Sequence, residues 1–320
     1  MEEGELIGTG GFATIHKGKF RGVTVAIKKL LVDSEQSKNH RSKQFSQLRH
    51  EALIQTGLSH PNITKVLCIS FKPFAMILEY LPLGNLYDYV KKWENPLPWD
   101  LRIKFSMDIA EAIRFMHEKV PIISHLDIKS PNVLISSLNP GDPVCAKLAD
   151  FGTAQPIRFT LKVHPVDNPV WLAPEALSRN AFDEKVDIYA FGVVCWELLT
   201  REEFFGEFQF MSEISDAVIS GRRPEIPKYC PPQYKSIIEK CWTMKPEERP
   251  KWSWVLETLE QLKATGPALE TTYGAQQNAI IYDKKIQKTN SMKQKEDVKQ
   301  AILEDKEKAE RRAVLEQKLL

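Results

Sequence analysis

The sequence predicts an α+β protein with two lobes, a small β-rich lobe followed by a larger helical lobe. Residues 4–30 alternate short apolar runs with glycine, which is typical of strands joined by tight turns. After Gly84 the apolar residues recur mostly at helical spacing. This change of period separates an N-lobe, residues 1 to about 80, from a C-lobe, about residue 84 to residue 263.

The elements of the N-lobe follow from local patterns. Beyond the first strands, the polar and basic segment Asp33–Gln44 leads into a helical stretch around Phe45–Leu58. Two apolar runs rich in β-branched and aromatic residues then predict strands at Val66–Phe71 and Phe74–Glu79. We therefore expect a sheet accompanied by one helix.

Two helices define the C-lobe. The first opens at Pro98 and Trp99 and places its apolar residues on one face. The second, Asp187–Thr200, is apolar almost all the way round, which indicates a helix buried in the core. It is too short and its flanks are too polar for a membrane span. The apolar face of the first helix consists of Phe105, Ile109, Ala112, Ile113 and Met116.

Composition limits the classes of function that remain. With 320 residues and 42% hydrophobic content the chain can bury a large core. A net charge of +2 creates no overall field that would attract nucleic acid or a membrane surface. The five cysteines are odd in number and form no C-x-x-C pair, and the N-terminus lacks the pattern of a signal peptide. We expect a soluble, cytoplasmic protein with reduced thiols, without a membrane span and without a nucleic-acid partner.

The composition changes after Lys263. The stretch ATGPALETTYGAQQN predicts a linker over residues 264–290, and about half of residues 291–320 are charged. Strong helix formers dominate this last segment, but no apolar heptad persists over several turns. The segment is therefore either a solvated helix, partly disordered, or a helix that binds a partner or another copy of the chain.

The first chemical motif is the glycine-rich stretch GTGGFATIHKG, residues 8–18, set between two predicted strands. Gly8, Gly10 and Gly11 carry no side chains, so the backbone N–H groups there can close over phosphates. Ala13 stands where a third glycine is usual. A strand on each side argues against a dinucleotide fold, in which the glycines would open a helix.

Five further motifs follow in a fixed order. Lys28 lies in VAIK on the next predicted strand, and Glu51 lies nine residues before HPN on the predicted helix, where it can form an ion pair with Lys28. The loop HLDIKSPN then supplies Asp127 and Asn132, LADFG supplies Asp150, and WLAPE supplies Glu175. Each motif is weak alone, but their common order and spacing argue against a chance match.

Over residues 4–263 these motifs resemble the eukaryotic protein-kinase fold. Four segments are similar to the tyrosine-kinase-like group of serine/threonine kinases: WLAPEAL, DIYAFGVVCWELLT, GRRPEIP and CPPQYKSIIEKCWTMKPEERP. The segment PVCAKLADFGTAQ is similar to Roco-type kinases. Lys129, two residues after Asp127, is typical of the serine/threonine class. The resemblance implies ATP as phosphate donor, Mg²⁺ as metal, and a protein substrate with a serine or threonine acceptor.

Phosphoryl transfer requires positioning and charge neutralisation more than covalent chemistry. Asp127 is expected to orient the acceptor hydroxyl and take its proton, and Lys129 to reach the γ-phosphate. Lys28 would fix the α- and β-phosphates while Glu51 holds it. The resemblance assigns Mg²⁺ to Asn132 and Asp150.

The resemblance also assigns the adenine site and two structural contacts. Adenine would lie between apolar side chains, hydrogen-bonded to the backbone of two residues and next to a gatekeeper. Glu175 is expected to pair with Arg249, and Asp187 to brace the catalytic loop. The adenine residues are Ile7, Ile15, Ala26 and Leu134 as lining, Glu79 and Leu81 as backbone partners, and Leu78 as gatekeeper.

Three departures from the family pattern leave an alternative open. Leu126 replaces the usual arginine of the catalytic loop, Gln55 replaces an apolar residue one turn after Glu51, and Asp167-Asn168 replaces Gly-Thr before WLAPE. None of these removes a catalytic group, so an active kinase is favoured. The alternative is a pseudokinase scaffold that binds nucleotide with little or no transfer.

Overall fold

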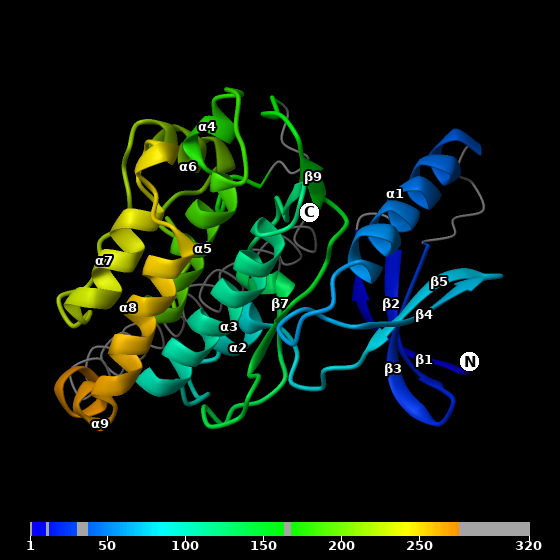
Figure 1. Cartoon of the computed structure of the whole chain (residues 1–320), viewed down its shortest axis with the longest axis horizontal. Helices are drawn as coiled ribbons and strands as arrows, with labels where there is room; N and C mark the ends of the chain where they lie inside the picture. The colour runs from blue at the N-terminus through cyan, green and yellow to red at the C-terminus, as the bar shows by residue number, and fades with distance from the viewer. Residues whose placement is uncertain (1, 11–12, 31–37, 163–167, 275–320) are drawn as a thin grey trace, which may run out of the picture. The chain divides into compact units, whose positions relative to one another are not determined.

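The computed structural model describes residues 2–10, 13–30, 38–162 and 168–274 (Figure 1). The chain divides into two compact units, Met1–Leu269 and Glu270–Leu320. Both lobes belong to the first unit. Of the second unit, the described part is the short π-helical turn η3, Glu270–Gly274. The predicted segment 291–320 and most of the predicted linker lie outside the described residues.

The N-lobe is a five-stranded antiparallel sheet in the order β1-β2-β3-β5-β4, accompanied by helix α1. The strands β4 and β5 have the predicted bounds. Helix α1 starts seven residues earlier than predicted and ends just before Gly57. The elements are β1 Glu2–Thr9, β2 Ala13–Phe20, β3 Val23–Leu30, α1 Lys38–Thr56, β4 Val66–Phe71 and β5 Phe74–Glu79.

The core of the N-lobe is built from both faces of this sheet. On one face Val25 and Ile27 of β3 pack with Ala75 and Ile77 of β5. Another cluster joins α1 to the sheet through Leu48, Ala52 and Met76. Lys28 on β3 is paired with Ile15 of β2 and with Met76 of β5. Directly paired residues point to the same face of a sheet, so the Lys28 side chain lies on the face where Met76 packs against α1. This packing brings α1 close to Lys28.

The C-lobe is predominantly helical, as predicted (Figure 1). Its longer helices are α3 Trp99–His117, α5 Lys185–Thr200, α6 Met211–Ile219, α7 Pro232–Cys241 and α8 Trp252–Thr265. The short helical elements are α2 Leu86–Lys91, η1 Ser130–Asn132, α4 Pro174–Leu177, η2 Pro246–Glu248 and α9 Pro267–Leu269. The short strands are β6 Ile122–Ser124, β7 Val133–Ile135, β8 Ala146–Leu148 and β9 Gln155–Ile157.

Helix α5 is the centre of the C-lobe. Its residues from Val186 to Thr200 are all buried, so the prediction of a helix enclosed on every side is confirmed. Gly192 permits a close approach of α7, because a β-carbon at this position would lie 2.8 Å from the β-carbon of Cys241. A helix packed this tightly is a rigid support for any segment that is hydrogen-bonded to its polar side chains.

Two short sheets bring the motifs together. In the β7·β8 pair, Val133 lies opposite Leu148, which places the end of the catalytic loop beside the strand that precedes Asp150. In the β6·β9 pair, Ile122 lies opposite Ile157, which places the segment before the catalytic loop beside the segment after Asp150. The motifs are thus gathered by backbone pairing between segments that are distant in sequence.

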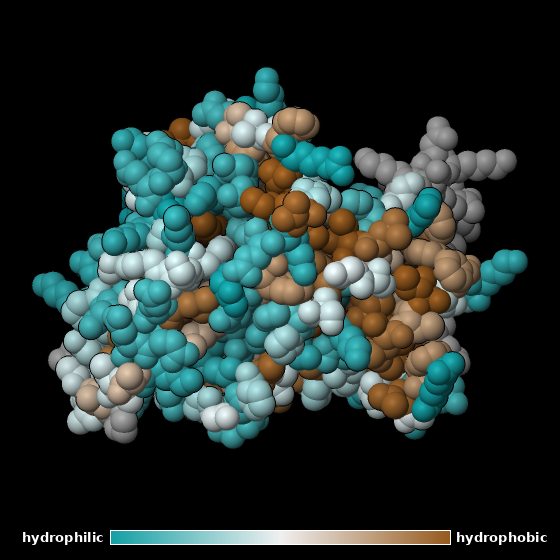
Figure 2. Space-filling model, in the orientation of Figure 1, coloured by the Kyte–Doolittle hydropathy of each residue, from teal (hydrophilic) through white to brown (hydrophobic). Residues whose placement is uncertain are grey.

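The surface differs between the lobes. On the face seen in Figure 2, apolar side chains gather over the N-lobe, whereas the C-lobe is mainly hydrophilic. None of the helices in the described ranges combines the length and apolar content needed to cross a bilayer. The exposed large apolar residues of the N-lobe are Leu6, Ile7, Val23, Phe45, Leu53, Leu67 and Phe71.

Candidate active site

The ammonium group of Lys28 lies between two carboxylates. Its Nζ is 2.6 Å from Oε1 of Glu51 on α1 and 2.9 Å from Oδ1 of Asp150. Lys28 and Glu51 are almost fully buried, whereas the side chain of Asp150 is 46% exposed. The expected Lys28–Glu51 ion pair is therefore present, and it anchors a lysine that also reaches the carboxylate expected to hold metal.

The Lys28 ammonium and the Asp150 carboxylate stabilise each other's charged form. Burial alone would lower the pKa of Lys28, but the adjacent Glu51 and Asp150 outweigh burial and raise it. Burial alone would raise the pKa of Asp150, but the Lys28 ammonium outweighs burial and lowers it. Lys28 and Asp150 are consequently both charged at neutral pH, as binding of phosphate and a divalent cation requires.

The catalytic loop presents Asp127 together with two partners. Lys129 Nζ lies 2.7 Å from Oδ2 of Asp127. The side-chain amide of Asn132, in η1, donates to the same oxygen and to the backbone carbonyl of Asp127, both at 2.9 Å. The loop thus folds back on itself so that the candidate base is oriented by a cation and an amide.

Asp187 of α5 fixes the start of this loop, as expected. Its Oδ2 accepts hydrogen bonds from the backbone N–H of His125 and from the Ser124 hydroxyl, both at 2.8 Å, and its Oδ1 accepts from the backbone N–H of Leu126 at 2.9 Å. His117 lies 3.0 Å from Oδ2 and adds a contact that the sequence did not suggest. Burial would raise the pKa of Asp187, but these hydrogen bonds and the nearby histidines lower it. A buried, ionised carboxylate therefore ties the loop to the core.

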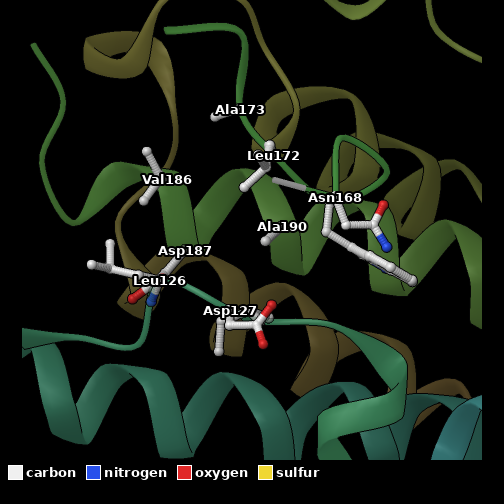
Figure 3. A pocket seen from close by; sticks show the side chains of 10 residues that line it. Leu126, Asp127, Asn168, Leu172, Ala173, Val186, Asp187 and Ala190 are labelled. Carbon is white, nitrogen blue, oxygen red and sulfur yellow. The ribbon is translucent and has the colours of Figure 1, made fainter. Parts of the chain in front are cut away.

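Leu126 lies in a small pocket between the catalytic loop and α5. The pocket is lined by Leu126 and Asp127 of the loop, by Val186, Asp187 and Ala190 of α5, and by residues of the segment before α4 (Figure 3). The Leu126 side chain is 2% exposed. The position that usually carries arginine is thus occupied here by a packed apolar side chain. The residues from the segment before α4 are Asn168, Trp171, Leu172 and Ala173.

The residues assigned to adenine belong to the strands of the N-lobe, to the segment that follows β5, and to β7. Ala26 is 9% exposed on β3, and Ile7 on β1 is 44% exposed. The backbone N–H of Glu79 already donates to Lys65, so the backbone group of Glu79 that is left for adenine is its carbonyl. The other adenine residues are Ile15 on β2, Leu78 on β5, Leu81 in the segment after β5, and Leu134 on β7. Of the glycines expected to close over the phosphates, Gly8 lies on β1 and Gly10 follows it, whereas Gly11 lies outside the described residues.

The donor atoms at the centre of the site fit Mg²⁺. One carboxylate oxygen of Asp150 contacts Lys28, while the exposure of the side chain leaves the carboxylate accessible to solvent. Asn132 uses its amide N–H₂ within the loop, which leaves its oxygen as an acceptor. Oxygen ligands of this type suit Mg²⁺. In the described part of the chain no group of three or more His, Cys, Asp or Glu side chains is placed to hold a metal ion. Phosphate oxygens and water would complete the coordination of a Mg²⁺ ion held by Asp150 and Asn132.

Several polar contacts around the site were not predicted from the sequence. Lys147 pairs with both carboxylate oxygens of Glu79 at 2.8 Å, and the Thr153 hydroxyl donates to the carbonyl of His125 at 2.9 Å. His50 bonds to the carbonyl of Ala154 at 2.8 Å. Each pair joins segments far apart in sequence, and the only sequence signal was proximity to a motif.

The expected pair of Glu175 and Arg249 is also present. The two guanidinium nitrogens of Arg249 donate to the two carboxylate oxygens of Glu175 at 2.6 and 2.8 Å. Both side chains are buried. This bidentate pair joins the WLAPE segment to the end of the C-lobe.

Comparison with known proteins agrees with this geometry. Residues 1–259 match the family of protein tyrosine and serine/threonine kinases, and the chain belongs to that family. Pats1, a probable serine/threonine-protein kinase of Dictyostelium discoideum, is 40% identical over 262 residues, covering 80% of this chain and 8% of the relative. The probable serine/threonine-protein kinase roco9 of the same organism is 39% identical over 257 residues, covering 80% and 8%.

A third relative bears a different kind of name. Cyclic GMP-binding protein C of Dictyostelium discoideum is 34% identical over 290 residues, covering 83% of this chain and 11% of the relative. The chain thus spans about a tenth of the length of these relatives. The similarity to Roco-type kinases, predicted from PVCAKLADFGTAQ, is confirmed by relatives of that name.

Proposed function

We propose that this chain is an active serine/threonine protein kinase that transfers the γ-phosphate of ATP to a hydroxyl group of a protein substrate. The observation that carries the proposal is the joint presence of the Lys28–Glu51 ion pair and the Asp127–Asn132 contact in one site. The first requires α1 to lie against the sheet, and the second requires the catalytic loop to be closed. A chain that binds nucleotide without transfer would still use Lys28, but it would not need the Asp127–Asn132 contact.

The reaction follows from these groups. The acceptor oxygen forms a bond to the γ-phosphorus while the bond from that phosphorus to the β,γ-bridging oxygen breaks, so ADP leaves. The proton of the acceptor hydroxyl passes to the carboxylate of Asp127. Lys129 neutralises charge on the γ-phosphate and Lys28 holds the α- and β-phosphates. Bound Mg²⁺, held by Asp150 and Asn132, would neutralise the negative charge of the phosphates.

The variant Asp127→Asn tests this proposal. Asparagine keeps an oxygen that can accept from Asn132 and Lys129, so the loop geometry should persist while the proton acceptor is lost. We expect transfer to a peptide to fall by at least about a hundredfold. Nucleotide affinity, measured by calorimetry, should stay close to that of the parent because Lys28 and Asp150 are intact.

The exposed substitution Asp216→Asn on α6 is the matched control and should leave transfer unchanged. Equal transfer by Asp127→Asn and the parent would overturn the assignment of the base. A parent that binds ATP but transfers phosphate to no acceptor would instead support the pseudokinase scaffold.

The organisation of the rest of the chain belongs to the same proposal. We place the kinase domain at residues 1–263, the linker at 264–290 and a charged segment at 291–320, which is either a solvated or partly disordered helix or a helix that binds a partner or a second copy of the chain. The free cysteines support a cytoplasmic location. The substrate would be a protein with a serine or threonine acceptor.

A further inference from the structure

Two side chains of helix α1 make polar contacts that lead to the chain around the segment Asp150–Gly152. After this segment, Nε2 of His50 donates to the backbone carbonyl of Ala154 at 2.8 Å. Before it, the link passes through Thr64, because the amide of Gln55 donates to the carbonyl and the hydroxyl of Thr64 at 2.9 and 3.0 Å. The position of α1 decides whether Glu51 reaches Lys28, so these contacts act on the centre of the site.

The contact through Gln55 is indirect and incomplete. Thr64 connects Gln55 to the strand before Asp150, because the backbone N–H and the hydroxyl of Thr64 both donate to the carbonyl of Leu148, at 2.9 and 3.0 Å. The side chain of Gln55 is 2% exposed, and its Oε1 is buried without a hydrogen-bond partner within the described ranges. A buried acceptor left unpaired is unfavourable. Gln55 therefore holds the C-terminal part of α1 less firmly than a fully satisfied group would.

The contact through His50 is direct. His50 is the residue before Glu51 and is exposed, whereas Ala154, whose backbone carbonyl accepts its hydrogen bond, is fully buried. The neighbouring Thr153 donates its hydroxyl to the carbonyl of His125 at 2.9 Å. The start of the activation segment, which is the chain between Asp150 and Glu175, is consequently bound to the catalytic loop by Thr153 and to α1 by His50.

We propose that His50 is a positioning residue for phosphoryl transfer. Its hydrogen bond to the Ala154 carbonyl holds α1 where Glu51 meets Lys28, and it couples α1 to the activation segment through backbone contact and without a phosphate group. The role rests on the transfer activity proposed above.

Two substitutions separate the hydrogen bond from the bulk of the ring. His50→Phe keeps a ring of similar size but removes the donor, whereas His50→Gln keeps a donor at similar reach. We expect kcat for peptide phosphorylation to fall about fivefold in His50→Phe and to stay near the parent value in His50→Gln. The KM for peptide should change little, because His50 does not face the acceptor. Since His50 is exposed, both variants should fold with unchanged melting temperatures.

Hydrogen exchange of the α1 amides gives a second readout that needs no activity. Exchange should accelerate in His50→Phe and remain at the parent rate in His50→Gln. Leu53→Ala, an exposed substitution on the same helix, should change neither readout. Parent-like kcat and exchange in His50→Phe would overturn the proposal, as would a His50→Gln variant as impaired as His50→Phe. If the parent itself transfers no phosphate, the proposed function fails, and the exchange experiment alone decides whether His50 positions α1.

Discussion

The backbone N–H of Leu126 donates to Oδ1 of Asp187 at 2.9 Å, while the backbone of Leu126 is left-handed, with φ of 63°. A bulky side chain in this conformation costs about 1–2 kcal/mol. The hydrogen bond to a buried carboxylate and the burial of the leucine side chain offset that cost. The conformation of the catalytic loop is therefore fixed by its hydrogen bond to α5 and by apolar packing. Position 126 carries no guanidinium group that could bind a phosphate on the activation segment.

This relationship predicts that activity depends little on phosphorylation of the activation segment. The hydroxyl of Thr153 is engaged with the catalytic loop, whereas Thr160 is exposed, so Thr160 is the candidate phosphosite. The chain beside it is already held, because Leu161 and Phe182 exchange two backbone hydrogen bonds of 2.8 and 2.9 Å. Thr160→Ala should retain most of the parent's turnover on an external peptide.

The measurement is kcat for Thr160→Ala and for the parent before and after phosphatase treatment. A loss of more than about tenfold, equivalent to ~1.4 kcal/mol in the barrier, would contradict this expectation. It would mean that another basic residue reads the phosphate.

Glu197 predicts a specific dependence of stability on pH. This residue of α5 is buried and accepts a hydrogen bond from the indole N–H of Trp171 at 3.1 Å. Burial raises the pKa of Glu197 to about 7 from an ordinary value of 4.5, although Lys91, Trp171 and Ser130 oppose the rise. The carboxyl group of Glu197 thus binds its proton more tightly in the folded state than in the unfolded chain. The contribution of this proton to the free energy of unfolding is complete below pH 4.5 and is lost as pH rises through 7.

Glu197→Gln should remove this loss, because glutamine keeps an acceptor for Trp171 and carries no charge. Relative to the parent, the free energy of unfolding of the variant should rise between pH 5 and pH 8, by up to about 3 kcal/mol. Urea unfolding at the two pH values measures it. The exposed Glu239→Gln on α7 is the control, and a difference from the parent that is the same at both pH values would refute the assignment.

The buried pair of Arg249 and Glu175 predicts a large loss of stability on truncation. Arg249→Ala leaves the Glu175 carboxylate buried without its cation, and such changes cost about 3–5 kcal/mol. Arg249→Lys keeps the charge but not the two parallel hydrogen bonds, so its loss should be smaller. Denaturant unfolding of the two variants measures the effect. A cost below about 1 kcal/mol for Arg249→Ala, the range of exposed ion pairs, would show that the pair is not buried in solution.

Removal of residues 291–320 should leave the intrinsic rate unchanged. None of the motifs that supply the site lies in this segment. The test compares kcat of the shortened and full chains on the same peptide, with sedimentation to record their oligomeric state. A large fall in kcat of a shortened chain that stays soluble would assign the segment a regulatory or dimerising role.

The sequence alone determined the two-lobed class of fold, the strands β4 and β5, and the buried helix α5. These follow from hydrophobic period and turn residues, which are local properties. It also identified the motif residues Lys28, Glu51, Asp127 and Asp150, because phosphoryl transfer demands fixed residue types in a fixed order. The start of α1 was predicted seven residues late, because the first turns of the helix carry polar residues without an apolar period.

Only the tertiary structure decided how these parts are held. The contact of His50 with Ala154 joins residues 104 positions apart, and that of Trp171 with Glu197 joins residues 26 apart. Neither has a local pattern, because each depends on how α1 packs on the sheet and how the segment before α4 packs on α5. The same holds for Leu126, whose replacement of arginine is visible in the sequence. Its left-handed backbone and its bond to Asp187 arise only when α5 presents a buried carboxylate to the catalytic loop.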